Sequence, residues 1–508
     1  MFSVVKNFFK DGFEEIKEVF IKPFLRLSFY KKCFLIILAG LVLYLPYMNT
    51  VNASHDERYT ILLCHFDILE MIKTIIAEDG HPPLSYLYAK LWIELFGGDV
   101  HQVLALRCAT LFMFFLTALL GVFPLKRLLG EKVSLAFVCF VFVLPSSFEL
   151  AMNMRMYPLA VFFMGGEFIY AMLAVYKPQK GDFLKFALFS LLALYTHYYC
   201  VILSIVIWGI VFIDLLRLKK YHDLISFFIG GFCVALLFVP WFFAFLSQYQ
   251  NITDLWYPQV GHAFMAIDGA LFSYHYVSRE YYKILCFFGI LCWLFVFEFL
   301  FDVKKEKLEY IVIKRATIVF WSIYLIALAL SLFLRPNLVE RYLVIPVAIF
   351  YMGIAVSFVH FKKFRLIFLS LFVIVFIMGY NGNRLKVQDK NYQQMQTYLR
   401  ENLPQNSLIL YDHTTSHLAL MFYAPEKNIC KALRKKYLEL FKEKVKQEEK
   451  NLENLKKYDK IYYMLSLWDW TEYNNCQEQW RSKYDNTAYC LKEISADTAK
   501  SIILHSKN

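Results

Sequence analysis

Charged residues are scarce in this chain, and the first group of them after the first apolar run is His55-Asp56-Glu57-Arg58. A carboxylate can accept a proton from a hydroxyl or an amine, so Asp56 and the adjacent Glu57 are candidates for acid–base chemistry. The alternative is a solvated Asp-Glu pair that caps a helix.

A second group follows in the same region, Asp79-Gly80-His81-Pro82-Pro83. The two prolines predict an extended turn that aims His81 in a fixed direction. The alternative for His81 is an ordinary turn histidine. Amphipathic stretches on either side of this turn predict two helices that lie along the membrane surface.

Three later groups are candidates for substrate binding: Arg155 with Tyr157, His197 with Tyr198, and Arg341 with Tyr342. Ionisable groups near a membrane are costly and usually face a cavity or a partner, although each one alone could be a snorkelling side chain. Two arginines and a histidine facing two carboxylates would suit a phosphate-bearing substrate and an acid–base step.

The elements that position these groups are predicted from the composition. The chain has 508 residues, of which 59% are hydrophobic and 19% charged. Its length would suit about three soluble domains, but this composition is too apolar for them. We predict a mainly α, polytopic membrane protein with about eleven transmembrane helices, since bilayer spans need roughly 20 apolar residues. The apolar runs lie near 33–48, 103–123, 133–149, 156–176, 183–196, 198–216, 224–246, 282–301, 316–334, 342–359 and 364–380.

The net charge of +12 is dispersed in short gaps between these runs. This pattern fits the positive-inside rule better than a nucleic-acid groove, so no nucleic-acid partner is expected. With the N-terminus in the cytoplasm, all of the basic clusters fall on the cytoplasmic side. The candidate site residues, including those in the first outer loop (49–102), fall on the opposite side.

Both ends of the chain differ from the membrane domain (33–380). Residues 1–32 predict an interfacial amphipathic helix on the cytoplasmic face. Residues 381–508 predict a small α/β domain on the outer face, with β-type runs at 407–411 and 460–465 and a charged helical stretch near 431–457. Cys430, Cys476 and Cys490 fall in this domain, where a Cys476–Cys490 disulfide and free thiols are both compatible with the sequence.

Several short motifs resemble the GT-C membrane glycosyltransferases. They begin with Asp56-Glu57-Arg58-Tyr59 and continue with His81-Pro82-Pro83-Leu84-Ser85-Tyr86, Leu95-Phe96-Gly97, Leu106-Arg107, Arg155-Met156-Tyr157, Tyr195-Thr196-His197-Tyr198 and Glu340-Arg341-Tyr342. The resemblance covers roughly residues 30–360. Within the superfamily it points to the bacterial branch of lipid A aminoarabinose and lipopolysaccharide-core transferases, which is related to protein O-mannosyltransferases.

The resemblance implies transfer of a sugar, with inversion, from a polyprenyl-phosphate donor to a cell-envelope glycolipid or protein acceptor outside the bacterial inner membrane. It implies that Asp56 is the base, that Glu57 orients a substrate, and that Arg155, His197 and Arg341 bind the lipid phosphate. His81 and Tyr157 would shape the sugar pocket, and Tyr198 and Tyr342 belong to the same matched motifs.

Other interpretations stay open at this point. His55, Asp56, Glu57, Asp79 and His81 have donor atoms that suit a divalent cation, but they lack a fixed ligand spacing, so no metal site is predicted. A transporter or flippase of lipid-linked sugars would show internal repeats, which this sequence lacks. An O-antigen polymerase or ligase typically carries its large outer loop late in the chain.

Overall fold

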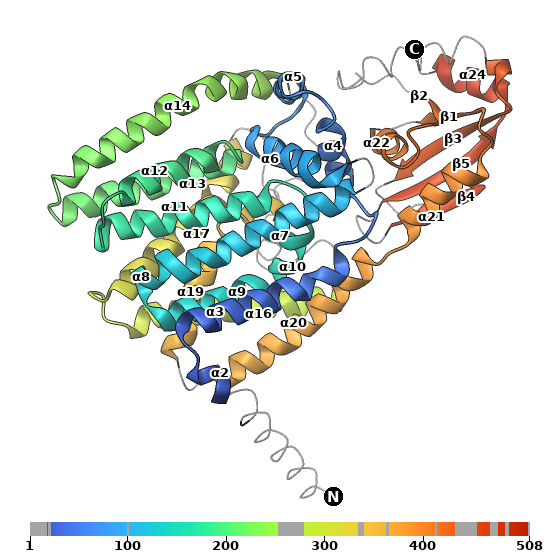
Figure 1. The fold of residues 1–508 in the computed structure, drawn as a ribbon. Coiled ribbons are helices and arrows are strands. Elements are labelled where there is room, and N and C mark those ends of the chain that lie inside the picture. Colours follow the sequence, from blue (N-terminus) through green and yellow to red (C-terminus); the bar gives the residue numbers. More distant parts are fainter. Residues whose placement is uncertain are drawn as a thin grey trace, which may run out of the picture.

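A long helical body and a small α/β domain make up the chain in the computed structural model (Figure 1). The structure describes residues 18, 22–98, 101–251, 279–333, 340–361, 365–411, 414–431, 455–467, 476–482 and 487–505. Most of the N-terminal amphipathic segment and most of the charged stretch near 431–457 therefore lie outside the described residues. Of the N-terminal segment, helix α2 (Lys22–Arg26) is described.

Each predicted apolar run contains a helix, and these helices form the body. They are α3 (Phe29–Tyr44), α7 (Gln102–Leu120), α9 (Glu131–Val143), α11 (Tyr157–Tyr176), α12 (Asp182–Leu194), α13 (Tyr198–Arg217), α14 (Asp223–Asn251), α16 (Arg279–Asp302), α17 (Leu308–Phe333), α19 (Val347–His360) and α20 (Arg365–Val387). Among the described residues, six helices are long and apolar enough to cross a membrane, and two shorter apolar helices accompany them. The protein is thus an integral membrane protein.

The run predicted at 133–149 is broken into two helices. Leu144 is extended between α9 and α10 (Pro145–Met152), and Pro145 opens the second helix. Proline at the first helical position disfavours a helical conformation of the preceding residue, so the break follows from the sequence.

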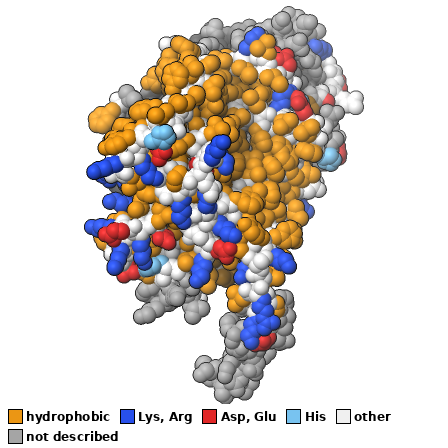
Figure 2. Space-filling view, turned by 60° about the vertical axis from the view of Figure 1, so that its left-hand side comes forward, with side chains coloured by type: hydrophobic (Ala, Val, Ile, Leu, Met, Phe, Trp, Pro, Cys, Tyr) orange, Lys and Arg blue, Asp and Glu red, His pale blue; other side chains and the backbone are white. Residues whose placement is uncertain are grey.

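The basic clusters assigned to the cytoplasm lie together at one end of the body. Arg127 of α8 (Lys126–Leu129) pairs with Asp182 at 2.6 Å, and Lys220 donates to the carbonyl of Val175 at 2.6 Å. Arg315 of α17 pairs with Asp214 of α13. Figure 2 shows Lys and Arg side chains gathered on one part of the surface beside a broad apolar area.

The first outer loop is helical: α4 (His55–Leu63), α5 (Ile68–Glu78) and α6 (Leu84–Trp92). The two helices predicted on either side of the Pro-Pro turn are present, but the first amphipathic stretch is divided. Asp67 accepts the backbone N–H of Glu70 at 2.9 Å and so caps α5, which separates it from α4. A capping aspartate competes with continuation of the helix through it.

The C-terminal domain is built on a five-stranded sheet in the order β2-β1-β3-β5-β4. The strands are β1 (Ser407–Tyr411), β2 (Asn428–Lys431), β3 (Lys460–Leu467), β4 (Glu478–Arg481) and β5 (Ala488–Ile494). The helices of this domain include α21 (Asn391–Thr397), α22 (Thr414–Tyr423) and α24 (Ala496–His505), whereas the short α18 (Glu340–Leu343) belongs to the body. Strands β2, β1 and β3 are parallel, whereas β5 pairs antiparallel with both of its neighbours, β3 and β4. Both predicted β-runs are strands, and Cys476 is bonded to Cys490.

A buried arginine joins the C-terminal domain to the first outer loop. Arg58 of α4 is fully buried. It donates to the hydroxyl of Tyr489 at 2.8 Å, and its guanidinium lies over the rings of Tyr392 and Tyr423, 5.2 and 5.6 Å from their centres. In Figure 1 the sheet accordingly lies beside the end of the body that carries α4. Helix α4 is shared by both parts of the protein.

We expect Arg58→Met to destabilise this junction by on the order of 3 kcal/mol, because the change removes a charged hydrogen bond and the ring contacts together. The melting temperature of the purified protein measures the effect. Tyr489→Phe removes the hydroxyl alone and should cost less. Equal melting temperatures for Arg58→Met and the wild type would contradict this account of the junction.

Candidate active site

Five segments meet at the end of the body that faces the C-terminal domain: α4, the turns that precede α6, α11 and α13, and α18. The turns before α6 and α13 are tied directly, because the backbone N–H of Leu84 donates to the carbonyl of Tyr195 at 3.0 Å. All nine predicted site residues lie on or next to these segments.

Asp56 and Arg341, 285 positions apart in the sequence, form an ion pair. Oδ2 of Asp56 lies 2.6 Å from Nη1 of Arg341. The two side chains are 31% and 26% exposed, so a ligand can reach both of them. A charge-assisted pair of this kind is also one that an anionic ligand can replace.

The electrostatic surroundings of Asp56 favour its ionised form. Partial burial raises the pKa of the carboxyl, but the positive charges of Arg341 and Arg155 outweigh burial and hold that pKa well below its ordinary value. Asp56 is therefore a carboxylate at neutral pH.

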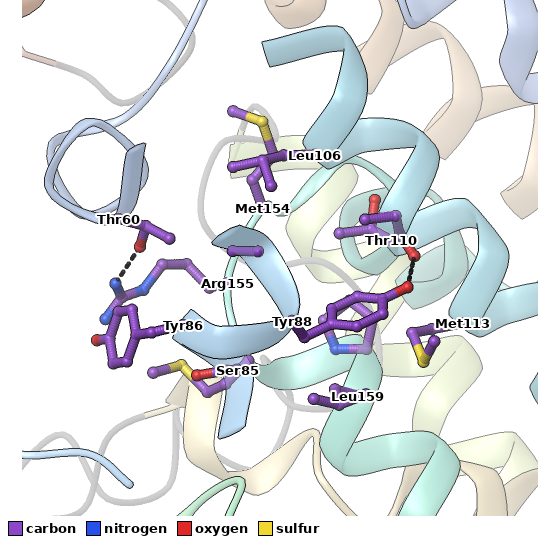
Figure 3. Close-up of a pocket in the computed structure, with 14 residues that line it drawn as sticks. Thr60, Ser85, Tyr86, Tyr88, Leu106, Thr110, Met113, Met154, Arg155 and Leu159 are labelled. Carbon is purple, nitrogen blue, oxygen red and sulfur yellow. Dashed lines mark hydrogen bonds between the residues drawn. The ribbon is translucent and has the colours of Figure 1, made fainter. Parts of the chain in front are cut away.

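Arg155 is fixed by contacts with α4. Its Nη1 donates to the backbone carbonyl of Asp56 at 3.1 Å and to the hydroxyl of Thr60 at 2.7 Å, and the guanidinium lies 5.7 Å from the centre of the Tyr86 ring. Figure 3 shows the guanidinium between Thr60 and Tyr86. Two arginines thus bring positive charge to the same carboxylate.

Glu57 accepts hydrogen bonds from two backbone N–H groups. Its Oε2 accepts the backbone N–H of Ser54 at 2.7 Å, completing a capping box on α4, and its Oε1 accepts the backbone N–H of Met154 at 2.9 Å. The side chain is buried, with 2% exposure. The helix-capping alternative therefore describes Glu57, which ties α4 to the turn that carries Arg155.

His81 is held by a buried carboxylate. Nδ1 of His81 lies 2.7 Å from Oδ1 of Asp79, and the Tyr86 hydroxyl donates to Oδ2 of Asp79 at 2.5 Å. Burial raises the pKa of Asp79, but the charge and hydrogen bond of His81 outweigh it, and the pKa is lowered. The sequence suggested Asp79 only as a possible metal ligand. Its spacing of two residues from His81 is the signal from which the contact between the two side chains could have been predicted.

Aromatic rings enclose His197. Its ring lies 4.8 Å from that of Tyr342, 5.3 Å from that of His81 and 6.0 Å from that of Tyr157. These rings come from α18, from the turn before α6 and from the first residue of α11. The structure thus brings His81, Tyr157, His197 and Tyr342 together, beside the pair of Asp56 and Arg341.

Tyr198 is placed outside this group. Its hydroxyl donates to Oε1 of Gln248 and accepts from Nε1 of Trp241 at 3.1 Å. Gln248 in turn donates to the backbone carbonyls of Ile75 at 2.9 Å and of His81 at 3.3 Å. Tyr198 therefore supports the His81 turn through α14, and its contact with substrate stays a prediction. In the sequence, Gln248 is an isolated polar residue at the end of an apolar run, and nothing there indicates its contact with Tyr198.

Among the described residues, no three His, Cys, Asp or Glu side chains are grouped so as to hold a metal ion.

A small cavity, mostly apolar, lies beside Arg155 between α6, α7 and α11 (Figure 3). Ser85, Tyr88, Met113 and Leu159 contribute to its lining, and the hydroxyl of Tyr88 donates to the carbonyl of Ala109 at 2.8 Å.

The structure is similar to solved structures of membrane transferases. It matches ArnT from Cupriavidus metallidurans in the apo state with a TM-score of 0.60 and 12% identity, over 90% of this chain and 97% of that chain. It matches ArnT bound to undecaprenyl phosphate with a TM-score of 0.57 and 13% identity, over the same shares of the two chains. An oligosaccharyltransferase from Archaeoglobus fulgidus matches with a TM-score of 0.46 and 11% identity, over 86% of this chain and 69% of that chain.

No protein-family model and no curated protein matches the chain. The likeness to ArnT extends over nearly the whole of both chains and includes the membrane body. The chain therefore has the fold of ArnT.

Proposed function

We propose that this protein transfers a sugar from a polyprenyl-phosphate donor to an acceptor in the cell envelope, on the outer face of the membrane. The observation that carries the proposal is the partly exposed carboxylate of Asp56 with Arg341 and Arg155 beside it. This arrangement combines a proton acceptor with positive charge for a phosphate. The fold supports it, since ArnT of the same fold has been solved with undecaprenyl phosphate bound.

In the proposed step the acceptor hydroxyl or amine loses its proton to Asp56 and attacks the anomeric carbon of the sugar with inversion. The bond between that carbon and the phosphate oxygen breaks, and the phosphate leaves with the electron pair. Arg341 and Arg155 stabilise the charge that grows on the leaving group. Since Arg155 is bound to α4, Arg341 is the arginine that can turn towards the phosphate.

The ion pair also links donor binding to the base. A phosphate that binds Arg341 competes with Asp56 for it, and the carboxylate then loses the charge that lowers its pKa. A carboxylate with a higher proton affinity is a better base at neutral pH. Donor binding is thus expected to precede activation of the acceptor.

Comparison of surface glycolipids and glycoproteins by mass spectrometry, from cells with and without this chain, tests the proposed function. A sugar that is added only when the chain is present supports the proposal and identifies the acceptor class. Identical glycolipids and glycoproteins in both cultures would contradict it.

The orientation makes a separate prediction. With the basic end of the body in the cytoplasm, a periplasmic reporter fused after Lys390, close to the end of α20, should be active. The same reporter fused after Lys220, at the basic end, should be inactive and is the matched control. Activity from the Lys220 fusion alone would overturn the orientation and place the site in the cytoplasm.

A further inference from the structure

A carboxyl group lies in the middle of the membrane body, away from the residues of the proposed site. Glu167 is the eleventh of the twenty residues of α11 and is fully buried. Its Oε1 accepts from the hydroxyl of Ser190 on α12 at 2.6 Å, and its Oε2 lies 2.8 Å from the hydroxyl oxygen of Ser204 on α13. The indole Nε1 of Trp208 donates to the same Ser190 hydroxyl at 2.8 Å. Glu167 therefore connects three helices.

This carboxyl group has no counter-charge beside it. Among the described residues, Glu167 forms no ion pair, and the titratable group that faces it is the thiol of Cys200 on α13. An isolated charge is costly away from water, and a buried acid without a cation takes up a proton instead. The surroundings of Glu167 thus favour the neutral acid over the carboxylate.

The hydrogen bonds around Glu167 are complete with this proton in place. In one such arrangement the Ser190 hydroxyl accepts from Trp208 and donates to Oε1 of Glu167. The proton on Oε2 is then donated to the oxygen of Ser204, whose own hydrogen can turn to a carbonyl of the preceding helical turn. Every donor of the network has an acceptor, and no charge is needed.

The network holds both arms of the helical hairpin that carries His197. Ser190 lies seven residues before His197, and Ser204 lies seven residues after it. Glu167 lies ten residues after Tyr157 on α11, or about 15 Å along the helix. At the outer end of these helices the rings of Tyr157 and His197 are 6.0 Å apart. Their relative position therefore depends on the register of the hairpin against α11.

The contact between α11 and α12 is close at the same level. A Cβ atom on Gly166 would overlap the ring of Phe189, so the two helices approach each other through a glycine. Apolar packing of this kind brings helices together, whereas hydrogen bonds across helices are directional and fix their register. The polar network supplies these directional bonds.

We propose that Glu167 is a protonated, uncharged acid that fixes the hairpin of α12 and α13 in register with α11. Resting on the function proposed above, this makes Glu167 a positioning residue for the site, because Tyr157 and His197 lie at the outer ends of the helices that it joins.

Infrared spectroscopy of the purified full-length protein, in a detergent without ester groups, tests the proton. At about pH 8 exposed carboxyl groups are ionised, so the carbonyl stretch of a protonated acid marks a buried one. The difference spectrum of the wild type and Glu167→Gln should contain this band. Glu131→Gln is the matched control, since the Glu131 side chain is 59% exposed, and its spectrum should equal that of the wild type in this region.

Binding of undecaprenyl phosphate tests the positioning. The amide of Glu167→Gln accepts from Ser190 and donates to Ser204, so this variant should keep the wild-type dissociation constant and melting temperature. Glu167→Leu has no such bonds and should bind about three- to tenfold more weakly, the size expected for one lost hydrogen bond. Where Glu167→Leu does not fold, Ser204→Ala removes one bond and gives the same comparison.

Four results would overturn the inference: no protonated-acid band in the wild type, a band that survives in Glu167→Gln, a glutamine variant that binds as weakly as the leucine variant, or a leucine variant that binds like the wild type. Failure of the wild type to bind undecaprenyl phosphate would instead count against the proposed function. The infrared result does not depend on that binding, so the two failures are distinguishable.

Discussion

Asp56→Asn should reduce sugar transfer by on the order of 10²- to 10⁴-fold, the usual contribution of a positioned general base. The amide has nearly the same shape as the carboxylate but cannot take a proton from the acceptor. Transfer is measured as the amount of the glycan modification that depends on this chain. Because the amide oxygen can still accept from Arg341, the protein should insert and fold normally.

Asp67→Asn is the matched control for this prediction. It makes the same chemical change in the same loop, at the residue that caps α5, and asparagine is an equally good cap. The control should transfer sugar at the wild-type rate. Asp56→Asn with near-normal transfer would remove Asp56 as the base and leave the site without an assigned proton acceptor.

Arg341→Gln should weaken binding of undecaprenyl phosphate by roughly 10- to 100-fold, because a buried or half-buried charged hydrogen bond contributes about 1.5–3 kcal/mol. The dissociation constant is measured on the purified protein. Lys73→Gln removes one positive charge from an exposed position of α5 and is the control for a general effect of net charge. An unchanged dissociation constant in Arg341→Gln would exclude this arginine from the phosphate clamp.

The same variant has a second effect on the pH dependence of transfer. Burial raises the pKa of Asp56 and Arg341 opposes that influence, so without Arg341 the pKa must rise. The base has to be ionised, and the ionised fraction is then lost at a higher pH as the solution is acidified. The acid limb of the rate profile should therefore move to higher pH in Arg341→Gln. A shift to lower pH would contradict the influence assigned to Arg341.

The large elements of this fold follow from the sequence because bilayer spans leave a strong apolar signal. The strands at 407–411 and 460–467 and the helices on either side of Pro82-Pro83 were predictable for similar reasons of periodicity and turn chemistry. The division between α4 and α5 was missed because both are amphipathic, and one capping residue, Asp67, decides the boundary. The break at Leu144 was missed although Pro145 marks it.

The site was predictable as a set of residues but not as a set of roles. The matched motifs brought together Asp56, His81, Arg155, His197 and Arg341, which do meet in the structure. Sequence cannot show which atoms of a side chain are already in use. Glu57 accepts hydrogen bonds from backbone N–H groups, and Tyr198 is bonded to Gln248 and Trp241; these structural contacts were not predicted.

Two residues of helix α4 that lie only two positions apart contact different parts of the protein. Asp56 belongs to the membrane site, and Arg58 is enclosed by tyrosines of the C-terminal domain. The two parts are therefore not modules that can be exchanged freely between related chains. A chimera that brings in a foreign C-terminal domain without matching tyrosines would leave a buried guanidinium without its partners, two residues from the proposed base. Engineering of this protein has to treat α4 and the C-terminal domain as one unit.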